Sequence, residues 1–196
     1  MTAQGQQNSP GLWPDLALVL FLVGFDVAAR LLLHAPNVSP VGASALFAGM
    51  MLRRRSLALA VPLAAMLIGD AVTGFYDGRV MAVVYAAMAL PAVAGVLARR
   101  YRRTARAIVP AVLACSLTFF AATNFAVWAF SGIYSLDMAG LLQCYVAALP
   151  FLKYTLAGDL FWAAVLFGGA WLVQRLTARG AIAGAAPRAG AESGVL

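Results

Sequence analysis

Long apolar runs separated by short polar connections make up most of the chain. Several of these runs approach or exceed the roughly 20 residues that an α-helix needs to cross a bilayer. The second run is short, so its helix either crosses fully or only re-enters the membrane. The pattern predicts an all-α integral membrane protein with six transmembrane helices, over residues 12–34, 41–52, 57–72, 80–98, 107–130 and 154–176.

A further apolar run, residues 139–149, lies just before the last predicted span. It is too short to cross, and Pro150 follows it, so we expect a re-entrant or interfacial helix that ends at the proline. The polar start carries no positive charge, so the first run does not have the form of a cleavable signal peptide. We expect a disordered N-terminus at residues 1–11, a six-helix domain over residues 12–176 and a flexible tail at residues 177–196.

Charge is scarce and unevenly placed. The 196 residues are 63% hydrophobic and 11% charged, with a formal net charge of +7. Arginines gather at residues 53–55, 99–106 and 175–179, beside predicted spans. Positive charge in short loops marks the cytoplasmic side, so six spans put these clusters and both termini in the cytoplasm, at a bacterial inner membrane. The clusters are expected to contact lipid headgroups rather than nucleic acid; docking of a cytoplasmic partner is the alternative.

The motifs of soluble nucleotide-binding and hydrolytic enzymes are missing from the sequence. It has no GxGxxG, P-loop, HExxH or GxSxG pattern, so we expect no ATP site in this chain. A single histidine and two cysteines without a CxxC pair argue against a multi-histidine metal site and a disulfide framework. Function is therefore expected from polar residues within and beside the apolar segments.

Charged side chains inside membrane spans are costly and mark functional candidates. Asp26 and Arg30 are four residues apart, so we expect them to neutralise each other on one helix face. Asp70 and Asp159 each follow a glycine, toward the side opposite the arginine clusters. We expect Asp159 and Lys153 to face Asp70 across a cavity that opens outward. The alternatives are that Lys153 extends to lipid headgroups and that Asp159 caps or pairs locally.

The outer side also gathers most other polar and aromatic residues, which is typical of a small-molecule pocket with a few polar groups in an apolar wall. For the aromatic residues, and for the histidine, a position at the membrane interface is the alternative. The predicted ligand-binding residues are His34, Asn37, Asp70, Phe75, Tyr76, Asp77, Arg79, Tyr85, Asn124, Trp128, Tyr134, Cys144, Tyr145, Lys153, Tyr154 and Asp159.

Small residues at helical spacing allow helices to approach closely. Gly24 and Ala28 share a face of the first predicted span, and Gly42, Ala45 and Gly49 lie in the second. We expect these residues to serve internal packing, with docking of a partner membrane protein as the alternative.

Several stretches resemble S components, the substrate-binding subunits of energy-coupling-factor (ECF) vitamin transporters. NVSPVGASALFAG at residues 37–49 and VPLAAMLIGD at residues 61–70 resemble the second and third spans of these subunits. Three later stretches are similar to the S-component-type family that includes small solitary vitamin B12 transporters of proteobacteria: TNFAVW at 123–128, CYVAALPF at 144–151 and TLAGDLF at 155–161.

The resemblance covers about residues 35–170. It implies a six-helix fold that binds a vitamin from the outer side and topples in the membrane, with or without an ATP-driven module. It also implies docking of that module at Gly24 and Ala28, which only approximate the AxxxA pattern of the family. The B12 group uses an outer-loop cysteine on cobalt, but residues 73–79 contain none. Cys144 or His34 would have to replace it, or the corrinoid would be held without a protein ligand.

The sequence therefore predicts a vitamin-uptake protein rather than an enzyme, with cobalamin or a related corrinoid as the ligand that the resemblance implies and with no intrinsic cofactor. Two other classes stay open. One is a non-catalytic membrane assembly or scaffold protein. The other is an intramembrane enzyme that uses Asp70 and Asp159 as a carboxylate pair, although no nucleophile or metal cluster accompanies them.

Overall fold

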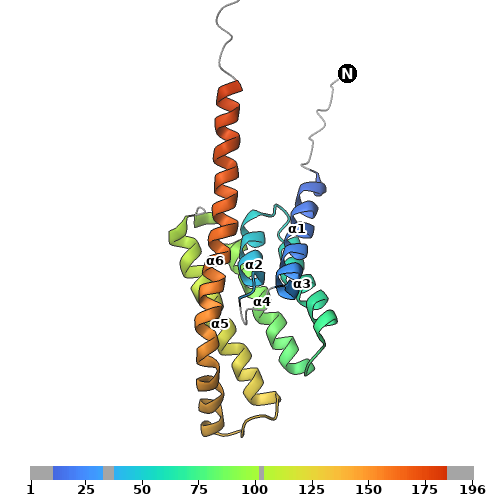
Figure 1. Cartoon of the computed structure of the whole chain (residues 1–196), viewed down its shortest axis with the longest axis vertical. Coiled ribbons are helices and arrows are strands. Elements are labelled where there is room, and N and C mark those ends of the chain that lie inside the picture. The colour runs from blue at the N-terminus through green and yellow to red at the C-terminus, as the bar shows by residue number, and fades with distance from the viewer. Residues whose placement is uncertain (1–10, 33–37, 102–103, 185–196) are drawn as a thin grey trace, which may run out of the picture.

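The computed structural model describes residues 11–32, 38–101 and 104–184, and all regular elements in these ranges are helical. Figure 1 shows them as one bundle from which α6 extends. The elements are α1 (Leu12–Leu32), α2 (Val41–Met51), α3 (Leu57–Thr73), α4 (Gly78–Ala98), the 3-10 helix η1 (Arg99–Tyr101), α5 (Ala105–Phe130) and α6 (Met138–Gly184).

The helices carry the composition of a membrane protein. Among the described residues, three helical segments are long and apolar enough to cross a bilayer: Gly78–Ala98, Arg106–Phe130 and Met138–Arg179. Two shorter apolar helices, α2 and α3, have 11 and 17 residues. The all-α, membrane-associated class is therefore confirmed, and the count of six complete crossings stays a prediction.

The expected break at Pro150 is wrong. Residues 138–184 form one continuous helix of 47 residues that passes through this proline. A proline removes one backbone hydrogen bond, but ending the helix would leave several backbone groups unpaired in an apolar environment, where each costs several kcal/mol. Pro62, Pro91 and Pro110 also lie inside helices. The short apolar run before Pro150 is thus the first part of α6, not a separate helix.

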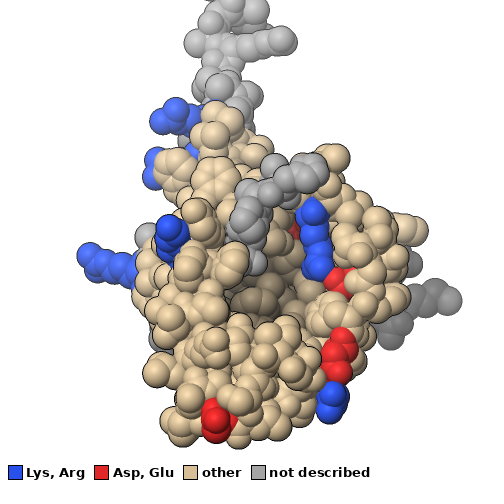
Figure 2. All heavy atoms as spheres, turned by 60° about the horizontal axis from the view of Figure 1, so that its bottom comes forward, with Lys and Arg blue, Asp and Glu red and all other residues tan. Residues whose placement is uncertain are grey.

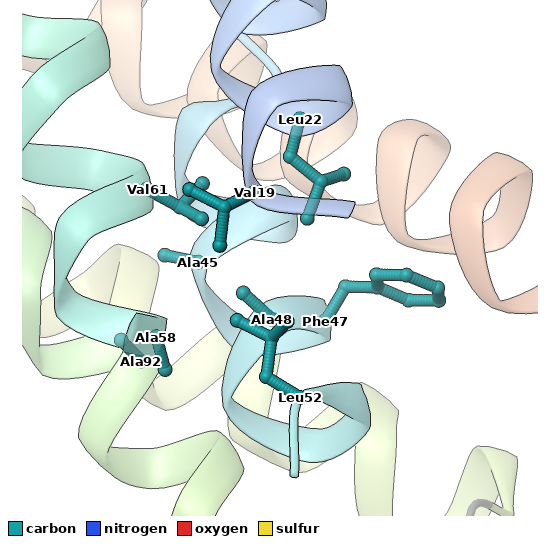
Figure 3. Close-up of a cluster of buried hydrophobic side chains, with 9 residues drawn as sticks. All are labelled: Val19, Leu22, Ala45, Phe47, Ala48, Leu52, Ala58, Val61 and Ala92. Carbon is teal, nitrogen blue, oxygen red and sulfur yellow. The ribbon is translucent and has the colours of Figure 1, made fainter. Parts of the chain in front are cut away.

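The short helix α2 is the centre of the bundle. Nine of its 11 residues are buried, and it packs against each of the other five α-helices. Burial on every side explains why its sequence is apolar all round. Figure 3 shows one side of this core, where side chains from α1, α3 and α4 meet α2 and Leu52, the residue that follows it.

Two glycines bring α2 and α4 into direct backbone contact. A Cβ atom added at Gly49 would meet the Ala92 carbonyl oxygen and the Gly95 Cα atom, and one added at Gly95 would meet the Leu46 carbonyl oxygen. No larger residue fits at either position without moving a helix. The expected internal packing of Gly49 is confirmed.

Gly24 and Ala28 lie on an exposed face of α1 instead. A Cβ atom added at Gly24 would have no heavy atom within 4 Å. Internal packing therefore does not account for these two small residues.

Two of the arginine clusters meet at one end of the bundle. The Asp15 carboxylate, in the first turn of α1, accepts hydrogen bonds from the backbone N–H groups of Arg53 and Arg54. The Arg99 guanidinium donates to the carbonyl oxygens of Gly49 and Leu52, at the C-terminal end of α2. The C-terminal half of α6 extends at this same end, while the connection between α5 and α6 lies at the opposite end (Figure 1). The arginine clusters therefore lie at one end of the bundle, as the sequence predicted, although Arg79 lies at the other.

Candidate ligand-binding site

A cavity of about 370 Å³ lies in the half of the bundle away from the arginine clusters. Every α-helix contributes to its wall, together with residues 38–39 before α2 and Tyr76 in the connection between α3 and α4. Figure 2 shows a hollow in the face that lies at the bottom of Figure 1, with its floor formed by uncharged residues. Its volume falls within the 300–1,000 Å³ typical of small-molecule sites.

The cavity wall is mostly apolar, with a few polar groups that converge on it. This combination is the usual form of a ligand site, since apolar area supplies affinity and placed polar groups supply orientation. The apolar lining is Ala29, Val38, Gly42, Ala43, Leu46, Met66, Val84, Ala87, Met88, Pro91, Val112 and Phe119. The polar or reactive lining is Arg30, Ser39, Tyr76, Cys115, Ser116, Thr155 and Asp159.

An ion pair forms one side of the cavity. The Arg30 guanidinium of α1 pairs with the Asp70 carboxylate of α3, which is only 1% exposed. The Tyr85 hydroxyl donates to the other Asp70 oxygen at 3.0 Å, and Arg30 also contacts the Met66 sulfur at 2.7 Å. Gly69 makes the pair possible, because a Cβ atom there would lie 2.8 Å from the Arg30 side chain.

The expected pair between Asp26 and Arg30 is wrong. The Asp26 carboxylate is fully buried and accepts a hydrogen bond from the Ser44 hydroxyl of α2 at 2.7 Å. Its other oxygen has no partner among the described residues. The four-residue spacing is correct for contact within a helix, but neighbouring helices supply each of the two side chains with a different partner.

Asp159 of α6 also lines the cavity. It has no partner of opposite charge in the described chain. The Ser116 hydroxyl of α5 donates to its carboxylate at 2.5 Å. Two glycines accommodate this arrangement: a Cβ atom at Gly42 would lie 3.1 Å from the Asp159 carboxylate, and one at Gly158 would lie 3.1 Å from the Val38 Cα atom. The glycine before Asp70 and the glycine before Asp159 therefore each allow the close approach of another segment.

Of the predicted ligand-binding residues, Tyr76 and Asp159 line the cavity, and Asp70 and Tyr85 lie behind it through Arg30. Tyr76 is 41% exposed. Burial, together with the negative charge of Asp70, raises the pKa of its hydroxyl. Tyr76 therefore stays neutral at physiological pH and can donate a hydrogen bond to a ligand.

Asp77 and Arg79 stabilise the start of α4 rather than line the cavity. The Asp77 carboxylate caps the helix by accepting from the backbone N–H groups of Arg79 and Val80, at 2.9 and 3.3 Å. It also binds the Arg79 side chain, and these hydrogen bonds lower the pKa of Asp77 to about 2. The Arg79 guanidinium reaches the Phe130 carbonyl oxygen at the end of α5. This cap thus stays ionised at physiological pH and joins two helix ends.

A second group of predicted residues joins α5 to α6 instead of lining the cavity. The Cys144 thiol donates to the Asn124 carbonyl oxygen at 3.4 Å, and the Tyr145 hydroxyl donates to the Ala121 carbonyl oxygen at 2.6 Å. The Trp128 indole donates to the Ser135 carbonyl oxygen at 2.9 Å.

The remaining predicted residues are also not among those lining the cavity. The Lys153 ammonium lies 4.9 Å from the centre of the Tyr154 ring, Phe75 is 62% exposed, and Tyr134 lies in the connection between α5 and α6. His34 and Asn37 lie outside the described residues.

Several residues that line the cavity were not predicted from the sequence. Arg30 was expected only as a structural partner of Asp26, and Cys115 only as a small core residue. Ser116 and Phe119 on α5 were not among the predicted residues. One signal was present: a partly buried aspartate such as Asp159 needs a hydrogen-bond donor, and Ser116 is a polar residue in an apolar run. Which helix would supply that donor depended on the packing of α5 against α6.

The described residues contain no group of three or more His, Cys, Asp or Glu side chains that could hold a metal ion. Cys144, one of the two candidate cobalt ligands, is buried against α5 and does not line the cavity.

The fold and the cavity define an all-helical, membrane-associated protein with a mostly apolar cavity in one half of its bundle. A family model matches residues 11–181, and the chain belongs to this family, which is a family of unknown function named DUF6580. No curated protein and no solved structure matched the chain.

Proposed function

We propose that this protein is a membrane transport protein of the S-component type that binds a vitamin-sized molecule in the cavity. The observation that carries the proposal is the cavity itself, about 370 Å³ in volume and walled by all six α-helices. A site shared by every helix of a bundle changes shape whenever the helices move relative to one another. That property suits a protein that must bind a solute on one side of a membrane and release it on the other.

The polarity of the bundle supports uptake as the direction. The cavity lies in the half opposite the arginine clusters. Positive charge marks the cytoplasmic side, so the cavity would open outward from an inner membrane. Six crossings, with both termini in the cytoplasm, remain our proposed topology.

Cobalamin is the ligand implied by the sequence resemblance, but the cavity favours a smaller vitamin. Its volume is near the lower limit for small-molecule sites, whereas a corrinoid is a large macrocycle. Cys144, proposed as a cobalt ligand, lies between α5 and α6 rather than at the cavity. A vitamin-class ligand is therefore our proposal, without cobalt ligation by Cys144.

The carboxylate pair required by an intramembrane enzyme has little support. Both Asp70 oxygens are occupied, one by Arg30 and the other by Tyr85. Asp159 binds Ser116 on a different helix pair. Neither carboxylate contacts the other, so the two are not arranged to share a proton or a metal ion.

An energising partner would dock on the exposed face of α1. Gly24 and Ala28 are exposed there, and Leu20 and Leu32 beside them are each 72% exposed. Small residues on an open helix face allow a second helix to approach closely. We expect Gly24→Leu to weaken co-purification of a membrane partner, if the protein works with an ECF module, and to leave vitamin binding intact.

The test of the proposed function is ligand retention. The protein is purified in detergent, incubated with a mixed vitamin pool that includes cobalamins, desalted, and analysed by absorption and mass spectrometry. We expect one vitamin to be retained by the wild type and lost from Ser39→Trp, which places a large ring at the cavity wall. Ile133→Trp, at an exposed site 72% open to solvent, is the matched control and should retain it. A folded wild type that retains nothing would contradict the proposal.

A further inference from the structure

The cavity contains one charged side chain whose charge is not balanced within the described chain. In the described part of the chain, ion pairs join Arg30 to Asp70 and Arg79 to Asp77. Neither pair includes Asp159, whose carboxylate accepts its one hydrogen bond within the described residues from the Ser116 hydroxyl. A carboxylate in a mostly apolar wall is costly unless a positive charge compensates it.

The positive charge of Arg30 does not serve this purpose. Its guanidinium is committed to the Asp70 carboxylate and contacts the Met66 sulfur. Lys153 is the cation nearest to Asp159 along α6, but six residues turn a helix by about 600°, so the two leave the helix in directions about 120° apart. The Lys153 ammonium lies against the Tyr154 ring, away from the cavity lining.

The rest of the wall also suits a positive charge. The rings of Phe119 and Tyr76 line the cavity, and the faces of aromatic rings attract cations. Sulfur atoms of Met66, Met88 and Cys115 add polarisable surface. The charge of Arg30 is cancelled by its ion-pair partner Asp70. With Asp159 ionised, the described cavity lining together with Asp70 therefore carries a net charge of one negative unit.

We propose that the cavity selects a small organic cation, such as a protonated amine or a positively charged heteroaromatic ring, whose charge lies at Asp159. This inference rests on the proposed function, because it names the charge class of the ligand that the same cavity binds. The apolar part of the ligand lies against Phe119 and the methionine side chains. The ligand supplies the counter-charge that the described chain does not.

The experiment compares ligands and variants that differ in one charge. The purified protein is offered a pool of cations (thiamine, choline, pyridoxamine), neutral compounds (riboflavin, nicotinamide, cobalamins) and anions (nicotinate, biotin, pantothenate). For a retained cation, calorimetry then gives the dissociation constant for the wild type, Asp159→Asn and Asp137→Asn. Asp137 is an exposed carboxylate that caps α6, and asparagine is an equally good cap. For choline, 3,3-dimethylbutan-1-ol is the uncharged isostere.

We expect a cation to be retained, its affinity to fall by roughly 30-fold or more in Asp159→Asn, and Asp137→Asn to bind like the wild type. Retention of a neutral or anionic vitamin, with equal affinity in Asp159→Asn, would overturn the charge assignment and leave the proposed function standing. Retention of no compound by a folded wild type would overturn both. Circular dichroism of each variant separates loss of binding from loss of folding.

Discussion

At the scale of single residues, each buried charge has an assigned polar contact, and most of these contacts cross between helices. Arg30 of α1 meets Asp70 of α3, Asp26 of α1 meets Ser44 of α2, and Asp159 meets Ser116. Within an apolar environment such contacts are needed because water is not there to solvate the charge. They hold specific helix pairs together around the cavity.

Removing one partner of the Arg30–Asp70 pair should destabilise the protein much more than removing both charges. Arg30→Met leaves the Asp70 carboxylate, 1% exposed, without its cation, and we expect a loss of about 3–5 kcal/mol in the free energy of unfolding. The double variant Arg30→Met with Asp70→Asn should recover much of this, because no charge remains buried. Denaturant unfolding in detergent, followed by circular dichroism, measures the difference.

Tyr85→Phe is the control for this pair. It removes one hydrogen bond to Asp70 but leaves the ion pair, so a loss of about 1–3 kcal/mol is expected. A double variant no more stable than Arg30→Met alone would show that the ion pair does not decide the stability of this region.

At the scale of elements, packing decides where helices run and how closely they approach. The short helix α2 is enclosed by the other five, and glycines at positions 49 and 95 set its contact with α4. The long helix α6 passes the cavity and continues beyond the bundle (Figure 1).

The α2–α4 contact predicts opposite effects for one substitution at two glycines. Gly49→Ala forces a methyl group against the Ala92 carbonyl oxygen and the Gly95 Cα atom, so we expect a loss of about 1–3 kcal/mol in the free energy of unfolding. Gly24→Ala meets no heavy atom and should gain up to about 1 kcal/mol from helix propensity. Equal effects of the two substitutions in thermal unfolding would contradict the close crossing.

The continuity of α6 can be measured directly. Val146 and Phe161 are exposed on either side of Pro150. Spin labels at these positions, in a chain whose two cysteines are replaced by alanine, should report backbone positions about 22 Å apart, since 15 residues rise 1.5 Å each.

A re-entrant helix that turned back at Pro150 would give a clearly shorter and broader distance distribution. Pro150→Ala is the matched control. In a continuous helix it leaves the distance unchanged, whereas at a turn it would alter the distance.

At the scale of the whole molecule, the arginine clusters at residues 53–55 and 99–106 and the cavity occupy opposite halves of the bundle. Asp15 and Arg99 hold the arginine-rich turn and the end of α2 at one end, and the residues lining the cavity lie toward the other. This polarity gives the bundle two different ends, as the proposed orientation across a membrane requires.

The polarity predicts a labelling pattern. In the cysteine-free chain, Ser135→Cys lies in the connection between α5 and α6, and Ser56→Cys lies beside the arginine turn; both positions are exposed. On intact spheroplasts, a membrane-impermeant maleimide should label Ser135→Cys, and should label Ser56→Cys only after lysis. The reverse pattern would place the cavity on the cytoplasmic side and contradict uptake.

The sequence by itself determined the class of the protein and most helix starts. Apolar runs bounded by polar or arginine-rich turns predicted helices beginning near residues 12, 41, 57, 80 and 107, each within two residues of the observed start. These boundaries can be predicted because an apolar helix pairs its own backbone groups. Where the helix ends, the backbone groups need water or polar partners, so the sequence changes from apolar to polar residues. The position of Asp159 at a cavity was also predicted, because a charged residue inside an apolar run is energetically costly and therefore marks a functional candidate.

Only the tertiary structure decided which residues meet. The spacing of Asp26 and Arg30 suggested a pair, yet Ser44 and Asp70 on other helices are their partners. Pro150 suggested a helix end, yet α6 continues because its apolar surroundings penalise unpaired backbone groups. The cavity draws single residues from helices far apart in the chain, and sequence periodicity shows only which residues share a face of one helix. Contacts between helices depend on close packing in three dimensions, so they emerged only with the fold.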